Sequence, residues 1–292
     1  MGNQIKLGDR YVGKDNKLYF ISEIGINHNG DINVAKRLID ASYAIGWDCV
    51  KFQKRTPDIA VPDDQKNVIR STPWGEMTYL DYKKKIEFGQ EEYDYIDQYC
   101  KYKPIAWTAS PWDMPSLEFL LQYDVPFIKI ASATNGNYEL LIEACKTGKP
   151  ILMSTGMCTQ DELDKAVSIL EDHSDGNYAL MHTNSVYPAP IDGLNLRYIQ
   201  TLKKRYNCVV GYSGHEQNLE PTVAAVTLGA DIVERHVTLS HDMWGTDQKA
   251  SLEINAMYML YHRCIDIQRM MGDGEKKLDE EELKVRKKLR VE

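Results

Sequence analysis

The fold is decided by the stretch PFIKIASATNGNYELLIEACKTGKPILMS, residues 126–154. Its two apolar ends, 126–130 and 150–154, are predicted strands, and the segment between them, 137–147, is predicted to be an amphipathic helix. A helical connection of this length joins two strands that run parallel. The stretch therefore predicts one strand–helix–strand unit of a parallel sheet.

The same alternation extends along most of the chain. Further strands are predicted at 18–24, 48–53, 105–109, 178–182, 208–212 and 231–236, with helices between them. Neither a G-x-G-x-x-G turn nor a phosphate-binding P-loop occurs, which disfavours an open nucleotide-binding sheet. The pattern predicts an α/β protein with a (β/α)8 TIM barrel.

We expect a single catalytic domain over residues 1–272, in which 1–16 form a short hairpin that caps the barrel floor. The charged tail, 273–292, is predicted to be a surface helix. A polar insertion follows the second strand, and loops of this length are often functional. Its residues Trp74, Glu76 and Tyr79 could fold over the barrel mouth as a lid.

Composition excludes several classes of function. The net charge is −8 with both signs interspersed, so we expect no nucleic-acid partner. No run of 18 apolar residues and no signal-peptide core occur, so we expect no membrane span and no secretion. The six cysteines have no regular spacing and indicate free thiols in a reducing cytoplasm.

Nearly every predicted strand ends in a polar residue that could take part in chemistry. These residues are Glu23, Lys51, Ser110, Lys129, Ser132, Ser154, Asn184, Ser213, His215 and His236. Barrel enzymes build their active sites at the carboxyl ends of the strands. The pattern favours an enzyme, and the alternative from another class is a catalytically silent sugar-binding or regulatory protein.

Two lysines, Lys51 and Lys129, are single charges within apolar strands. A buried ammonium group without a partner is costly, so we expect each to meet an anion. With the hydroxyl groups of the four serines at strand ends, they could clamp a phosphate and a carboxylate. The alternative is a structural ion pair with an acid of a neighbouring strand.

The two histidines follow adjacent strands, which brings His215 and His236 close together. Neutral imidazoles at such a rim suit a divalent transition metal, and a hydrogen-bonded structural pair is the alternative. Asp247 could be a third ligand or could accept a hydrogen bond from the substrate. Glu23 could exchange protons or orient water, and a salt bridge to Lys51 is compatible with that role.

Seven motifs resemble the sialic acid (N-acetylneuraminate) synthase family, in the order in which that family has them. They are ISEIGINHNG (21–30), KFQ (51–53), KIAS (129–132), MSTGM (153–157), HTNSVYP (182–188), GYSGH (211–215) and ERHVTL (234–239). Together they extend over roughly residues 18–253. A match of this order and length is far more specific than any single short pattern.

The resemblance implies that phosphoenolpyruvate condenses with the open-chain aldehyde of a hexosamine such as N-acetylmannosamine. The product would be a 2-keto-3-deoxy sugar acid, and the metal is typically manganese. Carried over, phosphoenolpyruvate would be bound by Lys51, Ser110, Lys129, Ser132, Ser154 and Ser213. The metal would be held by His215 and His236. The sugar would contact Gln53, Thr134, Asn184, Tyr187 and Asp247, Glu23 would handle the proton or the water, and the enzyme would be a homodimer.

Three departures from the family pattern make the sugar uncertain. Thr134 stands where the family has a glutamate that contacts sugar hydroxyls, and Asp247-Gln248 replaces an Asp-His pair. The chain also stops near Arg290, where the linker to the family's C-terminal antifreeze-like domain would begin. N-acetylmannosamine is therefore expected to be a poor acceptor. The enzyme alternative uses another, possibly phosphorylated, aldose, for which Arg55 would be the cation nearest the mouth.

Overall fold

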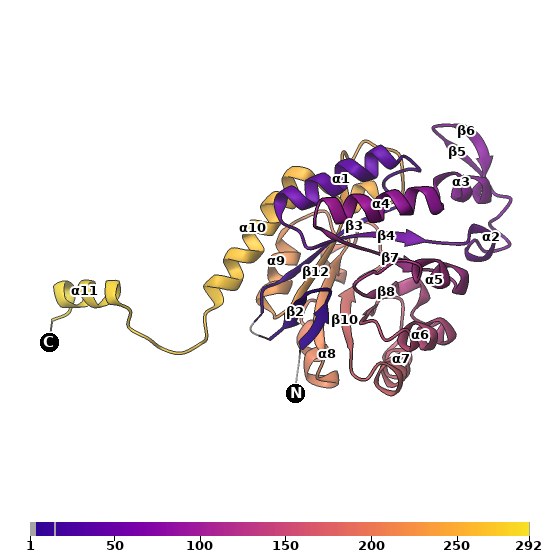
Figure 1. Ribbon diagram of the computed structural model, residues 1–292. Coiled ribbons are helices and arrows are strands. Elements are labelled where there is room, and N and C mark those ends of the chain that lie inside the picture. The colour runs from indigo at the N-terminus through magenta and orange to yellow at the C-terminus, as the bar shows by residue number, and fades with distance from the viewer. Residues whose placement is uncertain (1–3, 15, 292) are drawn as a thin grey trace.

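The computed structural model describes residues 4–14 and 16–291, and within these ranges eight parallel strands form a barrel (Figure 1). Around the wall the order is β7-β4-β3-β12-β11-β10-β9-β8. The strands are β3 (Tyr19–Gly25), β4 (Cys49–Lys54), β7 (Ala106–Pro111), β8 (Ile128–Ile130), β9 (Ile151–Ser154), β10 (Tyr178–Thr183), β11 (Val209–Gly214) and β12 (Ile232–Thr238). The predicted (β/α)8 barrel is confirmed.

Helices on the outside of the barrel follow these strands, and all but the last, α10, connect one strand to the next. They are α1 (Ile32–Ile45), α4 (Gln90–Tyr102), α5 (Met114–Leu120), α6 (Tyr138–Lys146), α7 (Gln160–His173), α8 (Tyr198–Tyr206), α9 (Glu220–Thr227) and α10 (Ile254–Met271). Several of these helices begin or end at a recognisable capping residue. For example, Asp31 accepts a hydrogen bond from the backbone of Asn33 at the start of α1, and Gly46 ends that helix in the left-handed region.

Each of the eight predicted strands differs from the observed one by one or two residues at an end. Two of them border the place where the wall closes. The segment 105–109 begins one residue later and continues to Pro111, and the segment 126–130 shortens to β8. Pro126 lacks an N–H group and cannot donate to the ladder. The carbonyl of Phe127 instead accepts a hydrogen bond of 2.8 Å from the Thr108 hydroxyl, which joins β7 to β8 where the wall closes.

The barrel interior is apolar at its floor. Side chains from six of its strands, among them Tyr19 and Ile232, fill the floor together with Phe127 just before β8, and each of these three is at most 2% exposed. The hairpin formed by β1 (Gln4–Leu7) and β2 (Arg10–Gly13) adds Ile5, Leu7 and Val12 to the same cluster. A second, larger cluster lies between the strands and the surrounding helices. Above the packed floor, the interior opens into a pocket at the carboxyl ends of the strands, where Lys51, Glu234 and His236 line it.

The insertion between β4 and α4 contains α2 (Pro57–Ala60), the antiparallel hairpin β5 (Ile69–Thr72) and β6 (Gly75–Thr78), and α3 (Tyr79–Ile86). Figure 1 shows it beyond the carboxyl end of β4. The smaller elements are η1 (Ser132–Thr134), η2 (Ile191–Gly193), η3 (Gln248–Ala250) and β13 (Leu252–Glu253). The insertion is therefore on the same side of the barrel as the strand ends.

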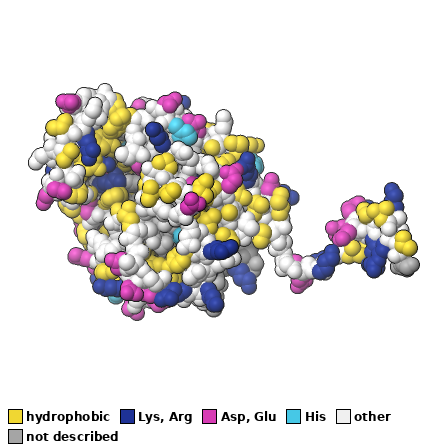
Figure 2. Space-filling view, turned by 180° about the vertical axis from the view of Figure 1, so that it is seen from behind, with side chains coloured by type: hydrophobic (Ala, Val, Ile, Leu, Met, Phe, Trp, Pro, Cys, Tyr) yellow, Lys and Arg dark blue, Asp and Glu magenta, His cyan; other side chains and the backbone are white. Residues whose placement is uncertain are grey.

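The last helix, α11 (Glu280–Leu289), lies apart from the barrel in both Figure 1 and Figure 2. All its residues are exposed, and Figure 2 shows acidic and basic side chains together on it. Across the ranges described above, no helix combines the length and the apolar character that a membrane crossing requires.

Candidate active site

The alternation of side chains along two strands builds most of the site. On β12, Ile232 belongs to the cluster inside the barrel and Val233 to the cluster outside it. Because successive side chains point to opposite faces, the two residues that follow Ile232 at even steps, Glu234 and His236, also point inward. On β4, Cys49 points into the barrel, and by the same alternation Lys51, two residues later, also points inward. One pocket is lined by Glu234, His236 and Lys51.

A buried cluster of charges occupies the inner end of this pocket. Lys51 Nζ lies 2.5 Å from Glu23 Oε2 and 3.7 Å from Glu234 Oε1. Lys129 Nζ lies 3.6 Å from the same Glu234 oxygen. The ion pairs that were the alternative for the two lysines are therefore present. They do not fill the pocket, because the ammonium groups also border the open space.

The serines at the strand ends complete this cluster. Lys51 donates to the Ser110 hydroxyl over 3.1 Å, and Lys129 donates to the Ser154 hydroxyl over 2.6 Å. Ser213 donates to Glu234 over 3.1 Å. With Ser132 these hydroxyl groups line the pocket beside the two lysines, as predicted from the strand ends. The arrangement offers ammonium and hydroxyl donors to an anion.

The pKa values of the two carboxyl groups in this cluster shift in opposite directions. Burial raises the pKa of Glu23, and Glu234 adds to this, although Lys51 opposes it. Burial would also raise the pKa of Glu234, but Lys129 and Lys51 together hold it at about 2. Burial lowers the pKa of Lys129 to about 8. The site thus combines a permanent carboxylate with two groups, Glu23 and Lys129, whose protons are more easily exchanged near neutral pH.

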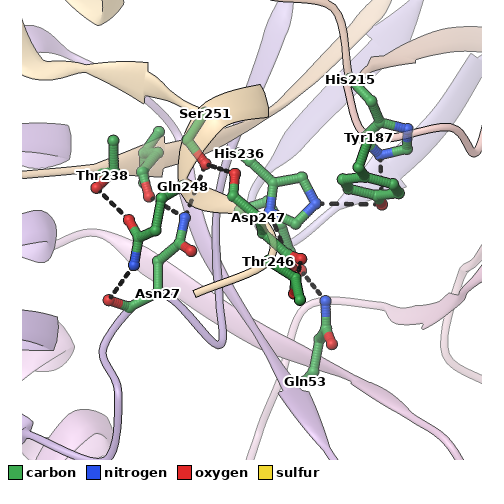
Figure 3. Close-up of polar contacts among 12 residues, drawn as sticks. Asn27, Gln53, Tyr187, His215, His236, Thr238, Thr246, Asp247, Gln248 and Ser251 are labelled. Carbon is green, nitrogen blue, oxygen red and sulfur yellow. Dashed lines mark hydrogen bonds and ion pairs between the residues drawn. The ribbon is translucent and has the colours of Figure 1, made fainter. Parts of the chain in front are cut away.

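The two histidines meet at a tyrosine hydroxyl. The ring centroids of His215 and His236 are 5.4 Å apart, as expected for adjacent strands. The Tyr187 hydroxyl lies 2.8 Å from His215 Nε2 and 3.4 Å from His236 Nε2 (Figure 3). His215 Nδ1 donates to the Asn184 carbonyl over 2.6 Å, which leaves Nε2 with a lone pair. Burial lowers the pKa of His215 to about 3 and that of His236 to about 4, so both imidazoles are neutral.

Asp247 approaches the other side of the His236 ring. Its Oδ2 lies 4.0 Å from His236 Nδ1, a nitrogen that has no hydrogen-bond partner. Within residues 4–14 and 16–291, no group of three or more His, Cys, Asp or Glu side chains could hold a metal ion. The geometry thus places Asp247 to orient the imidazole or to accept from a substrate, rather than beside the two Nε2 atoms.

The residue after Asp247 holds this loop in place. Gln248 is fully buried, accepts a hydrogen bond of 2.5 Å from the Thr238 hydroxyl, and donates to the Asn27 carbonyl over 3.3 Å (Figure 3). Ser251 donates to the Asp247 carbonyl over 2.7 Å and accepts from Asn27 over 2.8 Å. These contacts join the loop of η3 to β12 and to the turn after β3. The glutamine at this position therefore fixes where Asp247 lies.

Not all predicted sugar contacts reach the pocket. Gln53, Tyr187 and Asp247 line it, and Gln53 donates to Glu23 over 2.9 Å. Thr134 does not line it, because its buried hydroxyl turns back to the Ala131 carbonyl at 3.3 Å. Asn184 lies outside the lining as well. Its amide group donates to the Gly193 carbonyl and accepts from the Val186 N–H, which orders the loop after β10.

Several pocket-lining residues were not among the predicted site residues, and those that could take part in chemistry include Lys83, Trp112, Thr246 and Glu234. For Glu234 the signal was available, since it lies two residues before His236 on one strand.

Of the three lid candidates, Trp74 packs edge-to-face against Trp244, with ring centroids 5.9 Å apart. Neither Glu76 nor Tyr79 lines the pocket, and α3 reaches it through Lys83.

A sequence profile of the NeuB family matches residues 38–276. The chain belongs to the NeuB family. This match confirms the family resemblance of the seven motifs. In this NeuB family chain, residues from these motifs line the pocket at the carboxyl ends of the barrel strands.

The chain is also similar to two named relatives and to one solved structure. It is 35% identical to human N-acetylneuraminate-9-phosphate synthase, over 92% of this chain and 75% of that protein. It is also 35% identical to N,N'-diacetyllegionaminic acid synthase of Campylobacter jejuni, over 92% of this chain and 81% of that protein. The N-acetylneuraminic acid synthetase of Leptospira borgpetersenii, crystallised with citrate, superimposes with a TM-score of 0.88 at 30% identity. That match covers 100% of this chain and 99% of the other.

Proposed function

We propose that the protein condenses phosphoenolpyruvate with the open-chain form of an aldose, giving a sialic-acid-like 2-keto-3-deoxy sugar acid and phosphate. One observation carries this proposal. The same pocket holds two lysine–serine pairs around Glu234 and, next to them, two neutral histidines. The first set suits a small anion with a phosphate and a carboxylate, and the second suits the oxygen of an aldehyde or a metal that binds it. Membership of a family of sugar-acid synthases supports the same chemistry.

The residues fit a divalent metal, for which we propose Mn²⁺. His215 and His236 are neutral, and both Nε2 atoms face one point, which the Tyr187 hydroxyl reaches. On the other side of the ring, His236 Nδ1 has no hydrogen-bond partner and lies 4.0 Å from Asp247 Oδ2. Bound at the two Nε2 atoms, a metal would supply Lewis-acid polarisation of the aldehyde. Asp247 would orient the imidazole from its other side.

The remaining steps depend on side chains of this chain. Lys51 and Lys129, with Ser110 and Ser154, hold the phosphate and carboxylate of phosphoenolpyruvate and keep its C3 atom directed at the aldehyde carbon. The electrons of the C2=C3 bond form a C–C bond to the aldehyde carbon, and the C=O electrons move to the aldehyde oxygen, which ends as a hydroxyl with one of the two protons of the added water. C2 becomes an oxocarbenium-like centre. Water adds to C2, and the C2–O bond to phosphate then breaks. Donors already in place stabilise the charge that shifts onto phosphate.

Glu23 is the residue we propose for proton transfer to and from this water. Burial raises its pKa, and Lys51 and Gln53 fix the orientation of its carboxyl group. Such a group can accept the proton of the attacking water and return it as phosphate leaves. Glu234 stays ionised and holds the two lysines apart on either side of its Oε1 atom.

We also propose a homodimer located in the cytoplasm. The six cysteines are free thiols, and all are buried except the half-buried Cys158, which agrees with a reducing compartment. The proposal that N-acetylmannosamine is a poor acceptor stands as a prediction, since Thr134 supplies no carboxylate and its side chain lies outside the pocket lining.

The function is tested by the consumption of phosphoenolpyruvate. Purified protein is mixed with phosphoenolpyruvate, Mn²⁺ and one aldose at a time, from a panel of hexosamines and neutral hexoses, each free and as its terminal phosphate. We expect consumption to require both an aldose and the metal, and mass spectrometry to show a product enlarged by the three-carbon keto-acid unit. No consumption with any aldose of the panel would contradict the proposal.

A further inference from the structure

An ion pair on the outside of the barrel wall joins the two residues that adjoin the histidines of the site. Arg235 directly precedes His236 on β12, and Glu216 directly follows His215 after β11. We propose that this pair is a positioning device, which holds His215 and His236 at the separation at which both Nε2 atoms reach one metal ion. This rests on the proposed function, because it concerns the metal site assigned there.

The backbone ladder between the two strands ends just before the histidines. Among the residues that the structure describes, the register of β11 with β12 ends at the pair Gly214 and Arg235. His215 and His236 each come one residue beyond that pair. The β11–β12 ladder therefore does not extend to the two imidazoles, and their separation depends on side-chain contacts that cross between the two strand ends.

Arg235 points away from the pocket, to the outside of the barrel wall. The inward positions on β12 are those of Glu234 and His236, so Arg235 between them faces outward. Its outward neighbours on the strand, Val233 and Val237, belong to the apolar cluster between the strands and the helices. Arg235 is 0% exposed. A guanidinium group in that layer is costly unless its charge is paired and its N–H groups are bonded.

The guanidinium group of Arg235 is held by the segment that follows His215. One terminal nitrogen, Nη1, donates to the Glu216 carboxylate over 2.9 Å and to the Thr222 hydroxyl over 2.9 Å. It also lies 3.2 Å from the Asn218 carbonyl oxygen. The other terminal nitrogen, Nη2, donates to the backbone carbonyl of Glu216. The residue before one histidine is therefore bonded to the backbone of the residue after the other.

The carboxylate of Glu216 has partners on three elements. Besides Arg235 on β12, it accepts from the Tyr212 hydroxyl of β11 over 2.9 Å and from the Thr222 hydroxyl of α9 over 3.0 Å. Glu216 is 1% exposed. Its Oε2 atom also lies against Gly214, because a Cβ atom built there would come within 2.7 Å of it. The carboxylate thus packs against the last residue of β11, directly before the first histidine.

The energetics of such a pair favour a positioning role over a stabilising one. Replacing a buried ion pair by apolar side chains of similar volume is often neutral or stabilising, because taking two charges out of water offsets their attraction. Val233 and Val237 show that this layer accepts apolar residues. An apolar pair would lack direction, however, whereas a guanidinium fork on a carboxylate and a carbonyl fixes the geometry of both segments.

The test measures Mn²⁺ affinity in a protein that lacks the pair but keeps no unpaired buried charge. The double variant Arg235→Met/Glu216→Gln removes both charges, and its new amide oxygen can still accept from the hydroxyls of Tyr212 and Thr222. Circular dichroism and denaturant unfolding check the fold, and electron paramagnetic resonance of free Mn²⁺ gives the dissociation constant. We expect a folded protein whose dissociation constant for Mn²⁺ is raised about ten- to hundredfold, the usual effect of losing a group that orients metal ligands.

Phosphoenolpyruvate binding without metal should change much less, since Lys51 and Lys129 lie on β4 and β8. A loss confined to the metal distinguishes positioning of the histidines from a general disturbance of the pocket.

Two further variants disturb the same link in other ways. Gly214→Ala keeps both charges but forces the Glu216 carboxylate to move, because the added methyl group would lie 2.7 Å from its Oε2 atom. It should also weaken Mn²⁺ binding. Arg235→Lys keeps the charge but loses the planar fork. Its Mn²⁺ affinity should lie between those of the unaltered protein and the double variant.

The matched control is Lys203→Met. Lys203 on α8 pairs at 2.7 Å with Asp231, directly before β12, so this ion pair joins the other end of the same strand to a helix. We expect its Mn²⁺ affinity to equal that of the unaltered protein. An equal loss in this control would show a general effect of destabilisation and would overturn the positioning role.

Unchanged Mn²⁺ affinity in the double variant would also overturn the positioning role, while the proposed function would stand. If that variant does not fold, unchanged affinity in Gly214→Ala has the same consequence. An unaltered protein that binds no Mn²⁺, or a His236→Ala variant that binds it equally tightly, would instead overturn the metal site of the proposed function, and this inference with it.

Discussion

The two ends of the barrel interior are built from the same strands and differ in every other respect. At the floor, β4 and β12 contribute Cys49 and Ile232, which are fully buried among apolar side chains. Two residues further along each strand, Lys51 and Glu234 point into the same interior but surround an open pocket. The floor gains stability from close packing, whereas the mouth keeps buried charges at a cost in stability. On each strand, the residue that packs in the floor and the residue that lines the pocket are therefore only two positions apart.

The strongest test of this separation removes one histidine at the mouth. In His236→Ala the proposed metal loses one of its two protein ligands, and the Lewis acid is worth several kcal/mol of the barrier. We expect turnover to fall by roughly a thousandfold or more, and Mn²⁺ to lose its effect on thermal stability. Calorimetry with and without Mn²⁺, beside a rate assay, measures both.

His262→Ala is the control for that variant, because His262 is exposed on α10 and does not line the pocket. It should behave like the unaltered protein in both assays. Full turnover after complete chelation of divalent metal, or normal Mn²⁺ binding by His236→Ala, would contradict the assignment.

The second test acts on the floor. Phe127 is fully buried and packs edge-to-face against Tyr19, with ring centroids 6.3 Å apart. Phe127→Ala should lower the free energy of unfolding by about 3–5 kcal/mol, because it leaves a cavity. Denaturant unfolding measures this loss. The kcat per folded molecule should change little, and a large fall in kcat at full occupancy of the folded state would show that floor and mouth are not independent.

The third and smallest expected effect concerns Lys129. Replacing it with Met should weaken phosphoenolpyruvate binding by about 1.5–3 kcal/mol, the cost of one charged contact. Its pKa of about 8 adds a pH dependence. Lys129 is charged below that pH and neutral above it, so the affinity of the unaltered protein for phosphoenolpyruvate should fall as the pH rises through about 8. Titrations at several pH values should show this fall in the unaltered protein and a flatter profile in Lys129→Met.

Much of the architecture could be predicted without tertiary information. The strands are short apolar runs between helical segments of regular length, and this periodicity is a local property of the sequence. The polar residues at strand ends are also visible locally. A barrel then brings all the strand ends to one face, so the proximity of Lys51, Lys129, His215 and His236 follows from the fold class alone.

The partners of these residues were decided by the tertiary structure. Glu234 on β12 meets Lys51 on β4, one strand removed across β3, and Lys129 on β8, which is four strands away in the wall. Closure of the barrel brings these three side chains together, and that arrangement is not encoded within any one strand. Lys83 reaches the pocket from α3, a helix of the insertion. The rule that places strand-end residues at the barrel mouth makes no prediction for that helix. Thr134 and Asn184 were predicted to contact the sugar, but their side chains bond to nearby backbone instead. Local sequence determined which groups lie at the mouth. Distances between groups from different segments, and therefore their pairing and their pKa values, depend on packing that only the folded chain contains.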